Sequence, residues 1–416
     1  MRQRGSRAIL GLARAPLPRP PDQAVAHMFP VFAPSPRGRA HAPPEAQMAV
    51  DSAALPEPLA QATGLRSCGA TAGMLALGGK VVGRRMERIL DSPYFDGARF
   101  AAPIAARPTI ADPTSYVLDL VAGKQERKPK DPFPILKPET GSLLPGQGEP
   151  LRVTWLGHSS VLLEVDGVLF LTDPVFGPRA APVSWLGPKR FHAPPVPVES
   201  LPPVDAVIVS HDHYDHLDYP TVSKLARRGF RFITALGVGA HLEAWGVPPE
   251  RIIELGWWES TEVRGVEVTA TPSRHFSGRG PGAATQTFWA SWAFRGPRSS
   301  AWFSGDTGPY DEAFTEIGER FGGFDLTLVE SGAWNPNWSN IHLGPDNALR
   351  VHEQVRGRTM MPVHWGTFNL ATHAWDQPIV RLLQLSEQHD VRGPSATPGP
   401  RLPDLGPYAA RSTNCL

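Results

Sequence analysis

The chain has 416 residues, which fits one large domain or two or three smaller ones. Its 41 basic and 40 acidic residues leave a net charge of +1, which excludes the strongly basic footprint of a general nucleic-acid binder. Two cysteines, Cys68 and Cys415, exclude a disulfide framework and a cysteine-based zinc site. No apolar run reaches the roughly 20 residues that a membrane-spanning helix needs.

The N-terminal region has an unusual composition. Residues 1–50 contain seven arginines, two acidic residues and nine prolines, a pattern typical of a segment without a core. An Arg-rich, acid-poor start is also typical of a transit peptide, and translation from Met48 or Met74 is a further alternative. The small apolar segment 68–79 suits a signal-peptide core if translation begins at Met48, and otherwise a surface helix or linker. We expect residues 1–92 to be poorly ordered.

The rest of the chain divides by its patterning into three parts. Residues 93–150 are Pro-rich with little periodicity, and we expect them to wrap the following domain as an extended lead-in. The periodic part runs over 151–390 and predicts the globular domain. Residues 391–416 contain five prolines, and we expect a flexible tail.

Strands and helices alternate through the globular domain. A hairpin is predicted over 161–172, where Asp166-Gly167 joins two β-rich runs. Apolar runs predict further strands over 151–156, 204–210, 231–236, 266–272, 300–305, 324–330 and 359–365. Helices are predicted over 219–229, 311–321 and 345–355. This alternation predicts a mixed α/β layered fold.

The strongest chemical signal directly follows the apolar strand at 204–210. It is the run His211-Asp212-His213-Tyr214-Asp215-His216. Three imidazoles and two carboxylates would repel one another if buried without a partner, and a divalent metal ion removes that conflict. Residues two apart in an extended loop point to the same side, so His211 and His213 can bind one metal ion. Asp215 and His216 can then reach a second.

More ligands are needed, and later strand ends supply them. Ligands of open α/β sheets gather at the carboxyl ends of strands, and three later strands lead to His275, Asp306 and His364. We assign His211, His213 and His275 to the first metal ion. A second ion takes Asp215, His216 and His364, and Asp306 bridges the two.

This ligand pattern resembles the metallo-β-lactamase fold, an αβ/βα sandwich with two mixed β-sheets flanked by helices. The likeness extends to sequence blocks in one order, which resemble the N-acyl-phosphatidylethanolamine-hydrolysing phospholipase D family and its bacterial relatives over about residues 150–385. The blocks are Thr154-Trp155-Leu156-Gly157-His158, Leu171-Thr172-Asp173-Pro174, Gly187-Pro188-Lys189-Arg190-Phe191, His213-Tyr214-Asp215-His216-Leu217-Asp218, Trp257-Trp258-Glu259, Gly305-Asp306-Thr307-Gly308 and His364-Trp365-Gly366-Thr367-Phe368.

The resemblance implies a zinc-dependent hydrolase of phospholipase D type with two Zn²⁺ ions per subunit. Its expected reaction converts N-acyl-phosphatidylethanolamine to N-acylethanolamine and phosphatidic acid. Iron and manganese suit the same ligands. The chain departs from the animal members at Ser184-Trp185-Leu186, where they have Gln-Tyr-Met, and also at 338–341. Both regions border the substrate groove of the family, so the head-group and acyl preferences stay open.

Further residues have candidate roles in that reaction. Asp215, Asp306 and His342 are the candidate catalytic residues, and either Asp215 or His342 could give the leaving group its proton. His158 and Asp173 flank the first hairpin and could orient metal ligands, or serve the turns alone. We expect the substrate to contact Lys189, Arg190, Trp185 and Trp334. The alternatives are a solvated pair of cations, core-filling tryptophans and, for His342, a surface loop.

Other functions stay open on the sequence alone. A lactonase or a small-molecule phosphodiesterase on the same fold predicts a narrow polar pocket, whereas a lipid substrate predicts a wide apolar groove. A nuclease would need a basic stripe along the metal cleft. We expect a cytoplasmic protein that contacts a membrane peripherally and binds no nucleic acid. An exported form and a homodimer are further alternatives.

Overall fold

The computed structural model describes residues 75–389, apart from 105, 107–109, 132–134, 139–140, 146–147 and 281–284. The chain divides into two compact units, Met1–Ala62 and Thr63–Leu416, and only the second contains described residues. The predictions for residues 1–74 and for the tail after 390 therefore fall outside the described residues, as do Cys68 and Cys415.

The first half of the domain forms a six-stranded sheet. Its strands follow chain order: β1 (Leu151–Gly157), β2 (Ser160–Val165), β3 (Val168–Thr172), β4 (Ala206–Val209), β5 (Phe232–Ala235) and β6 (Ile252–Leu255). β1, β2 and β3 pair antiparallel, and the hairpin turn falls at the predicted Asp166-Gly167. β3 to β6 pair parallel, so their carboxyl ends lie along one edge.

The second half repeats this design with the order reversed. Its sheet runs β12-β11-β10-β9-β8-β7, with β7 (Ser260–Val263), β8 (Val266–Thr271), β9 (Ser291–Arg295), β10 (Ser300–Phe303), β11 (Phe324–Glu330) and β12 (Gly357–Val363). β10, β11 and β12 are parallel, whereas β7, β8 and β9 pair antiparallel. Both sheets are therefore mixed.

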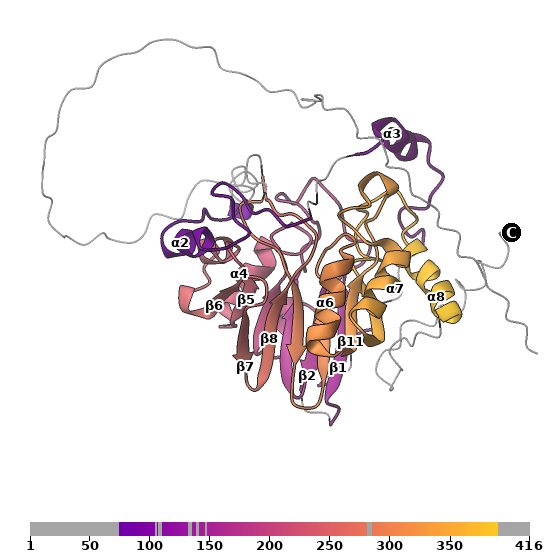
Figure 1. Ribbon diagram of the computed structural model, residues 1–416. Coiled ribbons are helices and arrows are strands. Elements are labelled where there is room, and N and C mark those ends of the chain that lie inside the picture. Colours follow the sequence, from indigo (N-terminus) through magenta and orange to yellow (C-terminus); the bar gives the residue numbers. More distant parts are fainter. Residues whose placement is uncertain are drawn as a thin grey trace, which may run out of the picture. The chain divides into compact units, whose positions relative to one another are not determined.

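The apolar core lies between the two sheets. Phe170 of β3 and Phe294 of β9 meet across it with ring centroids 5.0 Å apart, and both are fully buried. A second apolar layer joins the outer face of the second sheet to α6 (Asp311–Phe321), α7 (Gly344–Gln354) and α8 (Gln377–His389), which Figure 1 shows in orange and yellow. Helices α4 (Tyr219–Arg227) and α5 (Gly239–Ala244) pack their apolar residues on the first sheet. The result is a helix–sheet–sheet–helix sandwich.

The predicted strands and helices are all present, with ends that shift by at most two residues. The sequence analysis did not predict β6, β7, β9, α5 or α8. Three of these strands and helices, β6, β7 and α5, have only four to six residues, too few for a clear periodicity. They are stabilised by their neighbours in the fold.

The end of the N-terminal region 1–92 is more ordered than we expected. Arg84–Leu90 form helix α2, within the stretch 1–92 that we expected to be poorly ordered, and Ile89 is 1% exposed. The reason is tertiary: Ile89 belongs to the central apolar core, and Arg85 pairs with Glu254 at 2.9 Å. Further on, Phe100 stacks on Phe288 of the domain with centroids 4.6 Å apart.

Helix α3 (Pro113–Ala122) differs from the other helices of the lead-in and sandwich. Asp112 caps it by accepting from the N–H groups of Thr114 and Ser115, but none of its residues is buried. Within the described residues, no helix is both long and apolar enough to cross a bilayer.

The fold also predicts a pH effect on stability, through His352 of α7. This imidazole contacts the hydroxyl of Thr327 at 2.7 Å, and burial lowers its pKa from about 6.5 to about 4. The unfolded chain therefore binds more protons between these two values, so the free energy of unfolding falls as the pH drops through that window. We expect a shallower fall in His352→Gln, measured by urea unfolding at pH 7 and pH 5. An equal fall in both proteins would contradict this role.

Candidate metal centre

The candidate ligands meet where both sheets present the carboxyl ends of their strands. His211 follows β4 by one residue, and Asp306 follows β10 after a Ser-Gly turn. His275 lies beyond β8, and His364 comes directly after β12. The two halves of the sandwich thus contribute to one buried cluster, as the strand-end argument predicted.

Four of these side chains form a first group: His211, His213, His275 and Asp306. His211 Nε2 lies 2.8 Å from His213 Nδ1, and His275 Nε2 lies 3.3 Å from the same atom. Asp306 Oδ2 is 3.9 Å from His211 Nε2 and 3.7 Å from His275 Nε2. These are the residues that we assigned to the first metal ion together with the bridge.

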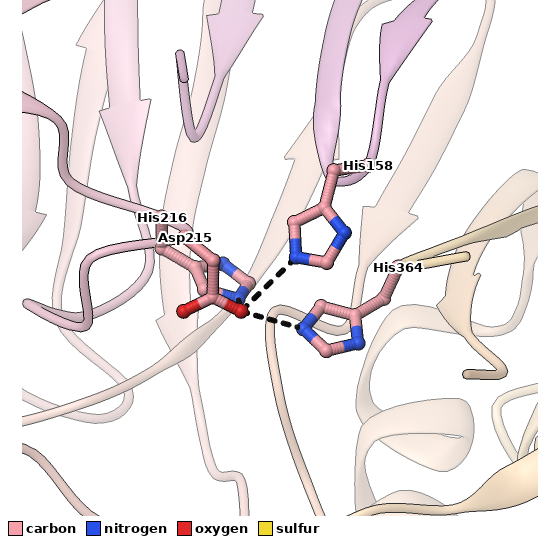
Figure 2. Close-up of side chains that lie close together, drawn as sticks. All are labelled: His158, Asp215, His216 and His364. Carbon is pink, nitrogen blue, oxygen red and sulfur yellow. Dashed lines mark hydrogen bonds and ion pairs between the residues drawn. The ribbon is translucent and has the colours of Figure 1, made fainter. Parts of the chain in front are cut away.

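A second group adjoins the first. It contains His158, Asp215, His216 and His364, which Figure 2 shows with their polar atoms converging. Asp215 Oδ2 lies 3.3 Å from His364 Nε2 and 3.6 Å from His216 Nε2. Asp306 reaches this group too: its two oxygens lie 3.1 Å from His216 Nε2 and 3.1 Å from His364 Nε2. Asp306 is thus the side chain common to both groups.

The donor atoms fit divalent cations in spacing and in chemistry. Two ligand atoms at 2.0–2.1 Å from one tetrahedral zinc ion lie about 3.4 Å apart, which the distances above bracket. Within the part of the chain that the structure describes, the buried atoms His216 Nε2 and Asp306 Oδ1 have no hydrogen-bond partner although they face each other. Buried polar atoms that no protein group satisfies indicate a ligand between them.

The electrostatics of the cluster also favour a cation. Burial and the neighbouring imidazoles hold the pKa of His211 well below its ordinary value, which leaves a lone pair free. Burial would lower the pKa of His364 as well, but Asp306 and Asp215 raise it to about 10. His211 thus favours its neutral form, whereas His364 favours its charged form. A divalent cation would bind the imidazole nitrogens and the carboxylates together and satisfy both.

Two flanking residues, Asp173 and His158, contact the ligands. Asp173 accepts from Ser210 N at 2.7 Å and lies 2.6 Å from His216 Nδ1, so it directs His216 Nε2 toward the cluster. His158 Nε2 lies 3.1 Å from Asp215 Oδ2 (Figure 2). Burial, with the nearby His364, lowers the pKa of His158 to about 3.

The backbone is strained at these same strand ends. His158, Asp173 and His364 have φ angles of 56°, 32° and 63°, in the left-handed region that residues other than glycine rarely adopt. The strain turns each side chain off the end of its strand and into the cluster. Non-glycine residues in this region gather at functional sites, where the surrounding structure holds them.

The sequence analysis did not predict the hydrogen bonds that hold the ligand-bearing loop 211–217 in place. Asp212 points away from the cluster and accepts from Gly278 N at 2.7 Å and from Thr287 Oγ1 at 2.8 Å. Arg279 is 2% exposed, donates to the carbonyls of Asp212 and Leu217 at 2.5 and 2.8 Å, and reaches Ala76 O as well. The buried Arg279 thus connects the ligand-bearing loop, through residues 212 and 217, to Ala76 near the start of the described residues.

We expect Arg279→Met to lower the free energy of unfolding by about 3 kcal/mol or more, because it leaves three buried carbonyls without their donor. Methionine keeps an unbranched apolar side chain but removes the guanidinium, whose carbon lies 4.1 Å from the centre of the Tyr214 ring. Urea unfolding of the metal-loaded protein measures the loss. The matched control is Arg358→Met, where a 79% exposed side chain predicts a change within about 0.5 kcal/mol. Equal free energies of unfolding for the two variants would show that the bonds of Arg279 do not stabilise the loop.

A buried carboxylate beside the cluster was missed too. Glu330 is the last residue of β11 and is 0% exposed, with Oε2 3.0 Å from His342 Nδ1. Burial raises the pKa of Glu330, and the charge of a protonated His342 opposes that rise. Glu330, His342, Asp306 and His364 form a further group of potential ligands. His342 therefore lines the centre and does not sit on a surface loop.

The residues expected to contact substrate fall into different places. Arg190 is 8% exposed, and its guanidinium donates to the backbone carbonyls of Val175, His192 and Leu156. Those bonds hold Arg190 inside the loop, and its contact with substrate stays a prediction. Lys189 is exposed, and Trp185 is 68% exposed. Trp334 is half-buried and, with His373, Lys124 and other residues, lines a cavity of about 350 Å³.

Comparison with known proteins agrees with this geometry. A family model described as the beta-lactamase superfamily domain matches residues 169–365. An uncharacterised protein of Mycobacterium tuberculosis is 47% identical over 295 residues, which make up 70% of this chain and 78% of that protein. N-acyl-phosphatidylethanolamine-hydrolysing phospholipase D 1 of Caenorhabditis elegans is 38% identical over 233 residues, or 53% of this chain and 65% of the worm enzyme.

One solved structure is similar to this chain at low sequence identity. It is Igni18, a metallo hydrolase from the archaeon Ignicoccus hospitalis, with a TM-score of 0.46, 20% identity, and coverage of 60% of this chain and 96% of that one. The family match, the mycobacterial relative and the converging ligands give one conclusion. The chain is a metal-dependent hydrolase of the metallo-β-lactamase superfamily, and its sequence is similar to that of an N-acyl-phosphatidylethanolamine-hydrolysing phospholipase D.

Proposed function

We propose that the protein is a di-zinc phosphodiesterase of phospholipase D type that converts N-acyl-phosphatidylethanolamine to N-acylethanolamine and phosphatidic acid. The observation that carries the proposal is the pair of ligand groups joined by Asp306, whose Oδ2 lies 3.7 Å from His275 Nε2 of the first group and 3.1 Å from His364 Nε2 of the second. The likeness to the worm phospholipase D supports the choice of substrate.

In this proposal the chain holds two cations with the assigned ligands. His211, His213 and His275 hold the first, Asp215, His216 and His364 hold the second, and Asp306 contacts both. Two such ions, when bound, lower the pKa of water toward neutrality and neutralise the charge that develops on phosphoryl oxygens. Asp173 and His158 orient His216 and Asp215, respectively.

The leaving group needs a proton, and two residues were candidates to supply it. Asp215 Oδ2 already contacts His158 at 3.1 Å and His364 at 3.3 Å, so this oxygen is engaged within the cluster. His342 touches the cluster through its Nδ1 edge and keeps 12% of its side chain exposed. We therefore assign His342 to the leaving oxygen, and Asp215 to metal binding alone.

A lipid substrate also calls for contact with a membrane surface, and α3 supports this part of the proposal. Val117, Leu118, Leu120 and Val121 of this helix are 40–82% exposed. The exposed cations Lys124, Lys128 and Lys130 follow in the chain, and exposed Trp185 and Leu186 add apolar surface elsewhere. Apolar side chains flanked by cations suit an anionic bilayer surface.

Hydrolysis of a synthetic N-acyl-phosphatidylethanolamine in detergent micelles tests the reaction. Mass spectrometry follows N-acylethanolamine and phosphatidic acid for the wild type beside Asp306→Asn. Both products from the wild type alone are expected. If the wild type holds two metal ions and yields neither product, the substrate assignment is wrong. A screen of lactones and small phosphodiesters then follows.

A further inference from the structure

We propose that Glu330 is a positioning residue for His342: it holds the imidazole with Nδ1–H toward its own carboxylate, so that Nε2 faces the substrate. The inference rests on the proposed function, because it explains how the proton donor of that reaction is oriented and which of its nitrogens carries the proton. Glu330 lies outside the ligand set assigned above, and its part in the chemistry is carried through His342.

The two carboxylate oxygens of Glu330 contact different groups: Oε1 accepts from the backbone, and Oε2 faces His342. Oε1 accepts from the backbone N–H groups of Thr307 at 3.0 Å and Leu343 at 3.2 Å. Oε2 lies 3.0 Å from His342 Nδ1. Both N–H groups adjoin the centre, since Thr307 follows Asp306 and Leu343 follows His342. The carboxylate is therefore clamped in one orientation, with a single oxygen left for the imidazole.

That orientation decides which nitrogen of His342 carries the proton. A carboxylate oxygen only accepts, so Nδ1 must donate to it, and the neutral ring then has its lone pair on Nε2. The ring is also fixed on its faces: it stacks on His364 with centroids 5.1 Å apart at 25°, and it lies 5.3 Å from His275. His342 thus stands beside residues of both ligand groups, next to the reacting phosphate of the proposed substrate.

The chemistry needs this tautomer. The oxygen of water forms a bond to phosphorus, the phosphorus–oxygen bond to the ethanolamide breaks, and that bond's electron pair stays on the leaving oxygen. His342 gives the leaving oxygen the Nε2 proton and afterwards recovers one from the attacking water. With Nδ1–H bonded to Glu330, Nε2 can donate and then accept a proton while the ring keeps its orientation.

Glutamine at position 330 keeps the shape of the side chain but reverses the direction of its hydrogen bond to His342 Nδ1. The N–H groups of Thr307 and Leu343 still require an oxygen at the Oε1 position. The amide nitrogen is then forced into the Oε2 position, where it donates to His342 Nδ1. We expect Glu330→Gln to move the imidazole proton to Nε2, so that the neutral ring cannot accept there.

Nitrogen NMR of ¹⁵N-histidine-labelled, zinc-loaded protein reads the tautomer directly. One of the 14 histidines is assigned to His342 as the signal lost in His342→Ala. The expected result is a proton on Nδ1 in the wild type and on Nε2 in Glu330→Gln. A proton on Nε2 in the wild type would overturn the proposal, because a protonated Glu330 would then be the donor. The wild-type spectrum decides this even if the variant does not fold.

Kinetics separate positioning from a merely structural role. We expect Glu330→Gln to lower kcat about 10²-fold with little change in KM and an unchanged zinc content. In the His342→Ala background the same change should cost little further, since the remaining imidazole near Oε2 is that of His364, whose Nδ1 lies farther away at 3.8 Å. Additive losses in the double variant, or loss of zinc, would refute the proposal.

The matched control is Glu164→Gln on β2. Glu164 is 2% exposed and pairs with Arg152 at 2.7 Å, outside the metal cluster. It should lose stability and keep kcat. If the wild type turns over a different phosphodiester, the proposed substrate fails while the tautomer and the kinetic coupling stay testable on that compound.

Discussion

Asp306→Asn is expected to lower kcat at least about 10³-fold and to reduce the bound zinc below two ions per chain. The side chain contacts both ligand groups, and asparagine has the same shape but removes the negative charge and one of the two anionic oxygens. Since 1.36 kcal/mol corresponds to a factor of ten in rate, this loss amounts to about 4 kcal/mol of transition-state stabilisation. Elemental analysis and steady-state kinetics measure the two effects.

The control for this variant lies at the opposite end of the same sheet. Asp325, near the start of β11, accepts from Ser300 N at 3.0 Å and pairs with the exposed Arg358. Asp325→Asn should keep two zinc ions and wild-type kcat, with only a small loss of stability. Full zinc content together with full activity in Asp306→Asn would show that this carboxylate does not join the two groups.

Removal of metal should lower the melting temperature by roughly 10 °C or more, the second large effect. A ligand that binds only the folded state at a thousand times its Kd adds about 4 kcal/mol of stability, and 1 kcal/mol shifts Tm by about 2–4 °C in a domain of this size. Without cations, the carboxylates and imidazoles of both groups remain buried against one another, which adds to the loss. Calorimetry before and after dialysis against a chelator measures the shift.

Added zinc should restore the melting temperature of the apoprotein. Asp306→Asn, already depleted of metal, should respond to the chelator by only a small part of the wild-type shift. Equal melting temperatures for the wild type with and without metal would mean that the groups do not bind cations tightly enough to matter for folding.

The sequence predicted the positions of the candidate ligands well, for a physical reason. Parallel strands place their carboxyl ends at one edge, so a polar residue just after an apolar strand is brought toward others of its kind. His211, Asp306 and His364 all obey this rule. Glu330 obeys it as well, and the same rule could have found it, because a carboxylate directly follows the apolar Leu328 and Val329 at the end of the strand 324–330.

Other features could not be found from local patterns. Arg279 lies in a loop rich in glycine and serine, and its acceptors come from residues 76, 212 and 217, so only the folded chain shows its role. Arg190 follows an exposed lysine and looks like a surface cation, yet the fold closes over it. Strand β9 is defined by its pairing with β8 and β10 more than by its own residues.

Because the two ligand groups draw on both sheets, their completion is tied to the order in which the chain emerges from the ribosome. Residues 211–216 are made first, but the first group waits for Asp306, and the second waits for His364 at the end of β12. A nascent chain that stops after the first sheet exposes a histidine-rich loop without the partners that close either group. Contacts over such sequence separations slow folding, so the cations are expected to enter late and to lock a nearly finished sandwich.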